Sequence, residues 1–105
     1  MIWRMALTSR SDSDTPVSWG VEFDDRARRE LRKLDIRMQQ EILRYLRERI
    51  ACPEDPRRFG KPLKRNLAGL WRYRVKDYRL ICRIEEDRVI VLVLRIGHRK
   101  EIYDE

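Results

Sequence analysis

Three arginines stand at positions where a phosphate-binding surface can form. Arg72 and Arg74 alternate with apolar residues in the segment 70–75, and Arg79 follows a two-residue turn. Because side chains alternate between the two faces of a strand, Arg72 and Arg74 point to one face and Trp71 and Tyr73 to the other. Arg79 belongs to the adjacent antiparallel strand, where cross-strand neighbours lie about 5 Å apart. The planar N–H donors of a guanidinium group match the geometry of phosphate oxygens, so this face is predicted to bind anions.

The positive charge of the chain is concentrated in the same region. The net charge is +7, and residues 57–79 hold nine cations and one anion, so this stretch carries +8 and the rest −1. Such a dense patch favours an anionic partner, for example a phosphate backbone. A solvated basic loop beside an acidic protein is the alternative interpretation, and the two do not exclude each other.

The C-terminal segment adds side chains that can transfer protons. His98 is the one histidine of the chain, and its reference pKa of about 6.5 suits proton transfer near neutrality. Gly97 is expected to break the last strand and to turn the chain back over the sheet. Tyr103 can stack on a base, donate a proton or pack the C-terminal edge. A purely structural role for His98 and Tyr103 stays open.

The residue types that several other mechanisms need are missing from the basic region. A metal nuclease needs clustered carboxylates or His and Cys ligands, so we expect neither a metal nor a cofactor. One histidine and no Gly-rich phosphate loop also speak against a catalytic triad and a P-loop. RNA can still be cleaved without a metal, because the ribose 2′-hydroxyl can attack its own phosphate. The protein then orients the groups, stabilises the phosphorane and moves protons.

The elements that must position these residues begin with a strand and two helices. Residues 19–23 alternate between apolar and other residues, which is typical of a half-buried strand. Asp24 fits the N-cap of a first helix that ends near Leu34. Asp35 can cap a second helix, whose apolar residues repeat every four positions.

The second half of the chain has a β pattern. Prolines and a glycine make residues 52–69 a long loop. Residues 70–75 and 78–84 form a hairpin around Lys76-Asp77, and residues 88–96 are almost continuously apolar, as in a central strand buried on both faces. The prediction is an α+β fold of order β-α-α-β-β-β, with a twisted antiparallel sheet and a helical hairpin on one face.

The chain is expected to form one cytoplasmic domain over residues 18–105. Residues 1–17 are interpreted as a disordered N-terminal extension because they lack apolar periodicity. No apolar run approaches the roughly 18 residues that cross a bilayer, and no secretory signal is evident, so no membrane partner is expected. Cys52 and Cys82 lack the spacing of a redox or zinc motif and are interpreted as reduced thiols.

Three segments resemble the RelE-type toxins of bacterial type II toxin–antitoxin systems, in the RelE/ParE superfamily. They are WGVEFD at 19–24 with the helix to residue 35, LWRYRVKDYRL at 70–80 and RIGHRKEIY at 95–103. The resemblance implies a fold like that of microbial RNase T1 and cleavage of mRNA in the ribosomal A site, which inhibits translation. It also implies a cognate RelB-like antitoxin, and binding of operator DNA by the toxin–antitoxin complex. Residues 1–17 have no counterpart in the family pattern.

The same resemblance suggests roles for individual residues. Arg72 and Arg74 stand where the family often has catalytic lysines, and Arg79 stands at the phosphate-stabilising arginine. Arginine stays charged above pH 12, so Arg72 and Arg74 suit phosphate binding, and proton transfer shifts to His98, Tyr103 or ribosomal groups. The candidate catalytic residues are Arg72, Arg74, Arg79, His98, Arg99 and Tyr103, and the candidate RNA-binding residues are Lys61, Lys64, Arg65 and Lys76.

Two other functions are compatible with the same residues. A ParE-like toxin would bind and inhibit DNA gyrase without catalysis, although that branch usually lacks the full set of basic residues and the terminal tyrosine. A basic nucleic-acid-binding module would bind in a salt-dependent way without cleavage or toxicity. We expect a metal-independent mRNA endoribonuclease whose partners are the ribosome, mRNA and an antitoxin.

Overall fold

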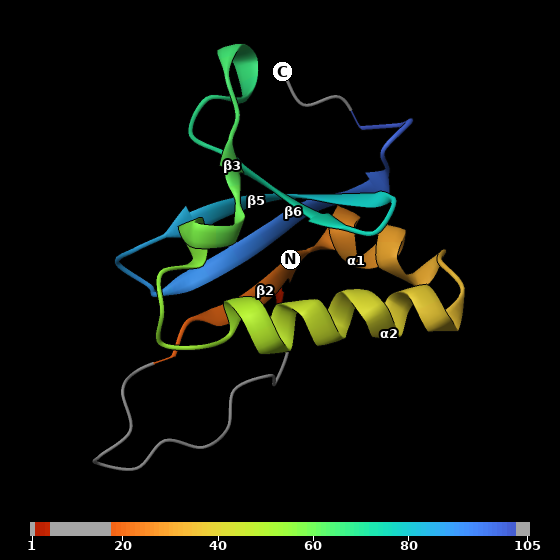
Figure 1. Cartoon of the computed structure of the whole chain (residues 1–105), viewed down its shortest axis with the longest axis horizontal. Coiled ribbons are helices and arrows are strands. Elements are labelled where there is room, and N and C mark those ends of the chain that lie inside the picture. The colour runs from red at the N-terminus through yellow and green to blue at the C-terminus, as the bar shows by residue number, and fades with distance from the viewer. Residues whose placement is uncertain (1, 5–17, 103–105) are drawn as a thin grey trace.

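The computed structural model describes residues 2–4 and 18–102 as two helices packed on one face of a six-stranded sheet (Figure 1). The sheet order is β1-β2-β6-β5-β4-β3. The main elements in chain order are β1 (Ile2–Arg4), β2 (Gly20–Asp24), α1 (Asp25–Arg32), α2 (Ile36–Tyr45) with a π-helical turn (Leu46–Ile50), β3 (Lys61–Pro62), β4 (Trp71–Val75), β5 (Tyr78–Glu85) and β6 (Ile90–His98). None of the described helices is long and apolar enough to cross a membrane.

Both helices begin at the predicted caps. The side chain of Asp24 accepts a hydrogen bond from the Arg26 amide at 3.3 Å, and that of Asp35 accepts one from the Met38 amide at 2.7 Å. These bonds satisfy amides that lack partners in the first turn. The Gln39 side chain donates to the Leu34 carbonyl at 2.8 Å, which ties the start of α2 to the segment after α1.

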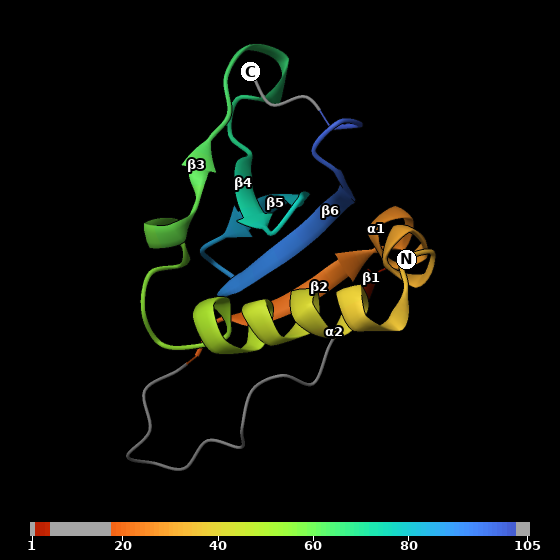
Figure 2. The ribbon, with the colours of Figure 1, turned by 45° about the vertical axis from the view of Figure 1, so that its right-hand side comes forward.

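The main core lies between the helices and one face of the sheet, here called the inner face (Figure 2). Its side chains on the strands include Val21, Phe23, Tyr73, Leu80, Cys82, Val91 and Val93. From the helical hairpin they meet Ala27, Leu31, Ile42, Leu46 and Ile50. Tyr73 is completely buried, and its hydroxyl donates to the Pro56 carbonyl at 2.7 Å, which anchors the long loop to β4.

A second, smaller core lies on the opposite face, here called the outer face. Leu63, Ile81 and Ile102 are buried there, with Leu67 and Leu70 packed beside them. A Cβ at Gly97 would lie 2.7 Å from the Ile102 side chain. The expectation that Gly97 breaks the last strand is therefore wrong. Gly97 lies within β6, where its missing side chain leaves room for Ile102 to pack.

The α+β class and the β-α-α-β-β-β order are confirmed, but the prediction of a wholly antiparallel sheet is wrong. β2 runs parallel to β6, with Gly20 opposite Ile90, whereas β4, β5 and β6 are antiparallel. Residue periodicity reports which face of a strand is buried but says nothing about its direction. The helical hairpin and the three strands after it, β3 to β5, form the long connection between the parallel strands β2 and β6.

Two short strands were not predicted. β3 lies in the expected loop, which also holds two 3₁₀ turns (Pro56–Phe59 and Arg65–Leu67). β1 pairs antiparallel with β2, although it lies in the segment interpreted as disordered. The remainder of that segment, residues 1 and 5–17, lies outside the described residues.

Candidate nucleic-acid interface

The β4–β5 hairpin brings the three predicted arginines together on the outer face. Arg74 lies directly opposite Arg79, and Arg72 precedes Arg74 by two residues on the same strand. Tyr73, between them, is completely buried on the inner face, so the alternate side chains lie on the outer face. The shared face predicted from the sequence is therefore present in the register of the sheet.

The three guanidinium groups are close enough to influence one another. The pKa of Arg72 is lowered, first by partial burial and then by the positive charges of Arg79 and Arg74. Arginine starts from such a high pKa that Arg72 remains charged at any physiological pH. An oxyanion placed between the arginines would reduce the repulsion between these charges.

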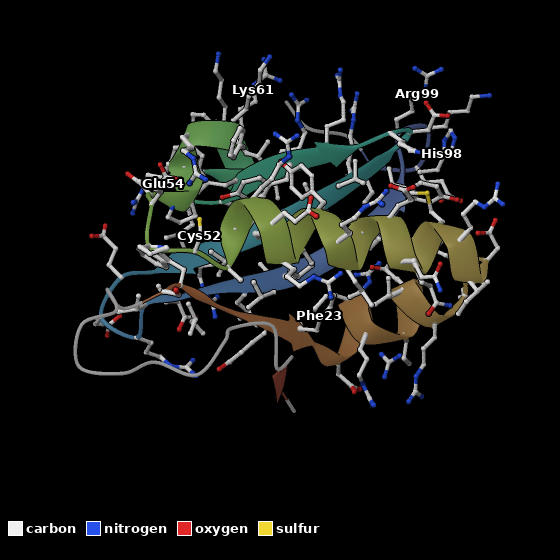
Figure 3. The ribbon with its side chains drawn as sticks, turned by 60° about the horizontal axis from the view of Figure 1, so that its bottom comes forward. Phe23, Cys52, Glu54, Lys61, His98 and Arg99 are labelled. Carbon is white, nitrogen blue, oxygen red and sulfur yellow. The ribbon has the colours of Figure 1, made fainter. Side chains whose placement is uncertain are left out.

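Lys61 extends this cluster across the next strand. It is exposed on β3 and stands directly opposite Arg72 in the register, so the two side chains share the outer face. In Figure 3, Lys61 and Arg99 both lie along the upper edge of the molecule, above α2. We call Lys61, Arg72, Arg74 and Arg79 the basic face.

The other predicted RNA-binding residues lie beyond the basic face. Lys64 and Arg65 are exposed on the loop after β3. Lys76 occupies the hairpin turn with a positive φ of 55°, and its Nζ is 3.5 Å from a carboxylate oxygen of Glu41 on α2. Lys76 is thus turned towards the helices and away from the basic face.

His98 is not brought to the basic face. It pairs with Tyr78, and the two rings meet edge to face with centroids 5.5 Å apart. Tyr78 packs against the main core, so the pair lies towards the inner face, whereas Arg79 pairs with Gly97 on the outer face. The Nδ1 atom of His98 accepts a hydrogen bond from the Lys100 amide at 3.1 Å.

Arg99 is anchored to the hairpin turn. Its amide donates to the Asp77 carbonyl at 2.8 Å, and its Nε is 3.9 Å from the Asp77 carboxylate. Both side chains are exposed. Tyr103 lies outside the described residues, so its predicted role stays a prediction.

Two glutamates that the sequence analysis did not single out hold the segment that carries Arg99. Glu30 on α1 accepts from the Ile96 amide at 2.8 Å and from Arg95 Nε at 3.2 Å. Glu101 accepts from the His98 amide at 3.4 Å. One signal in the sequence could have identified Glu30. It directly precedes the buried Leu31 of α1, and a carboxylate at the border of an apolar stripe needs a hydrogen-bond donor.

The described residues offer phosphate-binding donors and no evident metal ligands. Within residues 2–4 and 18–102, no three His, Cys, Asp or Glu side chains form a group that could hold a metal ion. Cys52 and Cys82 are both free thiols, and burial raises the pKa of Cys82. What the basic face can do is bind and stabilise a phosphate group in several charge states.

Comparisons with known proteins agree with this architecture. Residues 21–103 match the ParE toxin of the type II toxin–antitoxin system, parDE. Toxin RelG of Mycobacterium tuberculosis is 39% identical over 87 residues, which cover 83% of this chain and 98% of that protein. The mRNA interferase toxin RelE of Escherichia coli is 28% identical over 93 residues, which cover 85% of this chain and 94% of that protein.

Among solved structures, the toxin–antitoxin complex RelBE2 from Mycobacterium tuberculosis contains a chain with a TM-score of 0.72 and 37% identity. The match covers 79% of this chain and 100% of that one. Fold, family match and relatives therefore agree that this chain belongs to the RelE/ParE superfamily and is the toxin of a type II toxin–antitoxin system.

Proposed function

We propose that this toxin is a ribosome-dependent endoribonuclease that cleaves mRNA in the A site and thereby inhibits translation. The observation that carries the proposal is the basic face, where three arginines and Lys61 share one side of the sheet. Charge repulsion from Arg79 and Arg74 contributes to the lowered pKa of Arg72, and an RNA phosphate would relieve it. A relative named mRNA interferase supports the same activity.

In this proposal the arginines bind the scissile phosphate and stabilise the charge of the transition state. The ribose 2′-oxygen forms a bond to phosphorus while the bond to the leaving 5′-oxygen breaks. Because arginine keeps its proton, none of the three takes the proton of the 2′-hydroxyl. That proton passes to a group of the ribosome, directly or by relay through the Tyr103 hydroxyl, and a proton is returned to the leaving 5′-oxygen as its bond to phosphorus breaks. His98 is less suited to these transfers because it lies towards the inner face.

The partner in this proposal is a cognate RelB-like antitoxin in the cytoplasm. The relative in the RelBE2 structure is part of a toxin–antitoxin complex, and the basic face suits an acidic or amphipathic segment that folds on binding. The complex would bind its operator DNA through the antitoxin.

The test is primer-extension mapping of a defined mRNA with purified toxin, with and without programmed ribosomes. Arg79→Ala is expected to reduce A-site cleavage by about 100-fold, as removal of a transition-state donor does. Arg83→Ala is the matched control, because Arg83 is exposed on the same strand but bonded to Glu85 at 3.0 Å. Cleavage of free RNA, or intact mRNA from a toxin that arrests growth, would contradict the proposal.

Gyrase inhibition is the second candidate, because the matching family model describes a ParE toxin. A supercoiling assay with purified gyrase separates the two functions. Inhibition of supercoiling by wild type and Arg79→Ala alike, with mRNA left intact on ribosomes, would favour this alternative.

A further inference from the structure

Phe59 is an exposed aromatic side chain among arginines. It is 41% exposed, and among the described residues Ile36 is the other large hydrophobic side chain with high exposure. The guanidinium carbon of Arg58 lies 4.5 Å from the centre of the Phe59 ring, and that of Arg49 lies 5.1 Å from it. Aromatic rings and arginines together form the surfaces on which nucleic-acid bases stack.

The arginines of this cluster are held in place by the chain. Arg58 donates from Nη1 to the Asp55 carbonyl at 2.9 Å, and its Nη2 is 3.1 Å from the Glu54 carboxylate. Arg49 comes from the end of the helical hairpin and also lies 5.8 Å from the Tyr45 ring. Prior ordering of this kind lowers the entropy cost of binding a ligand.

The Phe59 cluster is next to the basic face. Phe59 precedes Lys61 by two residues, and two residues of chain span at most about 7 Å. Gly60, between them, packs against the inner-face side chains of β4, because a Cβ there would be 3.1 Å from Tyr73 and 3.2 Å from Trp71. Phe59 therefore lies at the β3 edge of the sheet, from which the chain passes to Lys61 on the outer face. An RNA strand that crosses this edge can place a base on the Phe59 cluster and a phosphate on Lys61.

We propose that Phe59, with Arg49 and Arg58, forms a base-stacking subsite for single-stranded RNA beside the basic face. The inference rests on the proposed function in that the RNA is the same substrate, but it concerns binding and not cleavage. A base stacks on the exposed part of this cluster, either on the Phe59 ring or on a guanidinium plane that lies over it. Arg49 and Arg58 also add positive charge for the flanking phosphates. Because every base has a π-face, the subsite adds affinity without selecting a sequence.

The experiment measures binding of a fluorescein-labelled single-stranded oligonucleotide, with 2′-O-methyl riboses that prevent cleavage, to the full-length protein by anisotropy. Phe59→Leu keeps an apolar side chain and removes the ring, and it is expected to weaken binding about tenfold. Phe59→Trp should bind like wild type. Ile36→Ala is the matched control, since it removes the other exposed apolar side chain at the opposite end of the helical hairpin.

Two further measurements make the result specific to stacking. An oligonucleotide of abasic nucleotides should bind wild type and Phe59→Leu equally. Lys61→Ala should reduce the salt dependence of binding, whereas Phe59→Leu should leave it unchanged, because a phosphate contact releases a counterion and a stacked base does not. Thermal unfolding within about 2 °C of wild type verifies that each variant is folded.

Three results would overturn the subsite: no binding of the oligonucleotide by wild type, equal affinity of Phe59→Leu, or the same loss on abasic RNA. If Phe59→Leu lost affinity for a cognate antitoxin but kept its affinity for RNA, this surface would be a protein interface instead. The cleavage assay is separate. A Phe59 effect on binding without any cleavage on ribosomes would refute the proposed function and leave the subsite standing.

Discussion

At the scale of single residues, arginine in place of lysine at positions 72 and 74 determines whether the basic face can accept a proton. A lysine at position 72 would experience the same burial and the same charges of Arg79 and Arg74 that lower the pKa of Arg72. Lysine starts from about 10.4 and can lose its proton when its pKa is depressed, which makes it a usable general base. Arg72 can bind phosphate but cannot accept a proton.

Arg72→Lys should therefore add a pH dependence to cleavage. The uncharged amine forms as the pH rises through its lowered pKa, so the cleavage rate of the variant should increase with pH beyond any increase in wild type. Single-turnover cleavage on programmed ribosomes between pH 6 and 9 would measure it. Parallel pH profiles for wild type and variant would show that position 72 takes no part in proton transfer.

Loss of the buried Tyr73 hydroxyl should have a clear effect on the free energy of unfolding. Burial raises the pKa of Tyr73, so the hydroxyl remains protonated and donates to the Pro56 carbonyl. Tyr73→Phe leaves that carbonyl without its donor and should cost about 1–3 kcal/mol of unfolding free energy. Urea denaturation measures the change. Tyr78→Phe, whose ring still packs on His98, is the control and should shift stability by less than about 0.5 kcal/mol.

At the scale of elements, local signals in the sequence were sufficient for the helices and the hairpin. Asp24 and Asp35 are the helix caps, and the Lys76-Asp77 turn joins β4 to β5 as predicted. The direction of β2 and the existence of β3 depend on pairing between distant segments, which periodicity does not encode. The shared face of Arg72 and Arg74 was predictable because alternation is local.

The position of His98 could not be predicted for the same reason. Its face depends on whether β6 continues through Gly97, and that is decided by the packing of Ile102 from the following turn. A glycine in a strand pattern can mark an end, a bulge or a close approach. Here it marks a close approach, so alternation continues to His98 and turns it from the basic face.

Gly97→Ala should disturb the whole C-terminal segment. The new Cβ would lie 2.7 Å from Ile102, so this side chain must leave its place in the outer core, at a cost of about 1–3 kcal/mol. Cleavage should fall as well, because Arg99 is carried on the same segment. In the double variant with Ile102→Ala the clash is gone, so the two stability losses should be less than additive in urea denaturation. Strict additivity would mean that the two side chains do not compete for the same space.

At the scale of the whole molecule, the charges divide between a basic outer face and ion pairs elsewhere. Hydrogen bonds and charges from arginines lower the pKa of several carboxylates, which are Asp25 beside Arg28, Glu41 beside Arg44, Asp55 beside Arg57 and Glu85 between Arg83 and Arg88. For Glu85, burial is the largest single effect and raises the pKa, but the hydrogen bonds and charges of Arg83 and Arg88 together outweigh it. The basic face instead gathers cations, and the positive charges of Arg79 and Arg74 contribute to the lowered pKa of Arg72.

This division predicts how stability depends on pH. A carboxylate with a lowered pKa in the folded state stabilises the fold above its unfolded pKa, and this contribution is lost as the pH falls through the folded value. Stability should thus be almost constant from pH 7 to 5 and decrease below about pH 4. The excess of 25 Lys and Arg over 18 Asp and Glu adds self-repulsion as the carboxylates become neutral.

Urea denaturation at pH 7, 5, 4 and 3 measures this dependence, and repeating it in 1 M salt separates its two causes. Salt screens the general repulsion among the cations at low pH, so it should recover part of the loss at pH 3. It should not raise stability at pH 7, where exposed ion pairs are weakened by the same screening. A stability that stays flat to pH 3 would mean that the arginine–carboxylate pairs contribute nothing to folding.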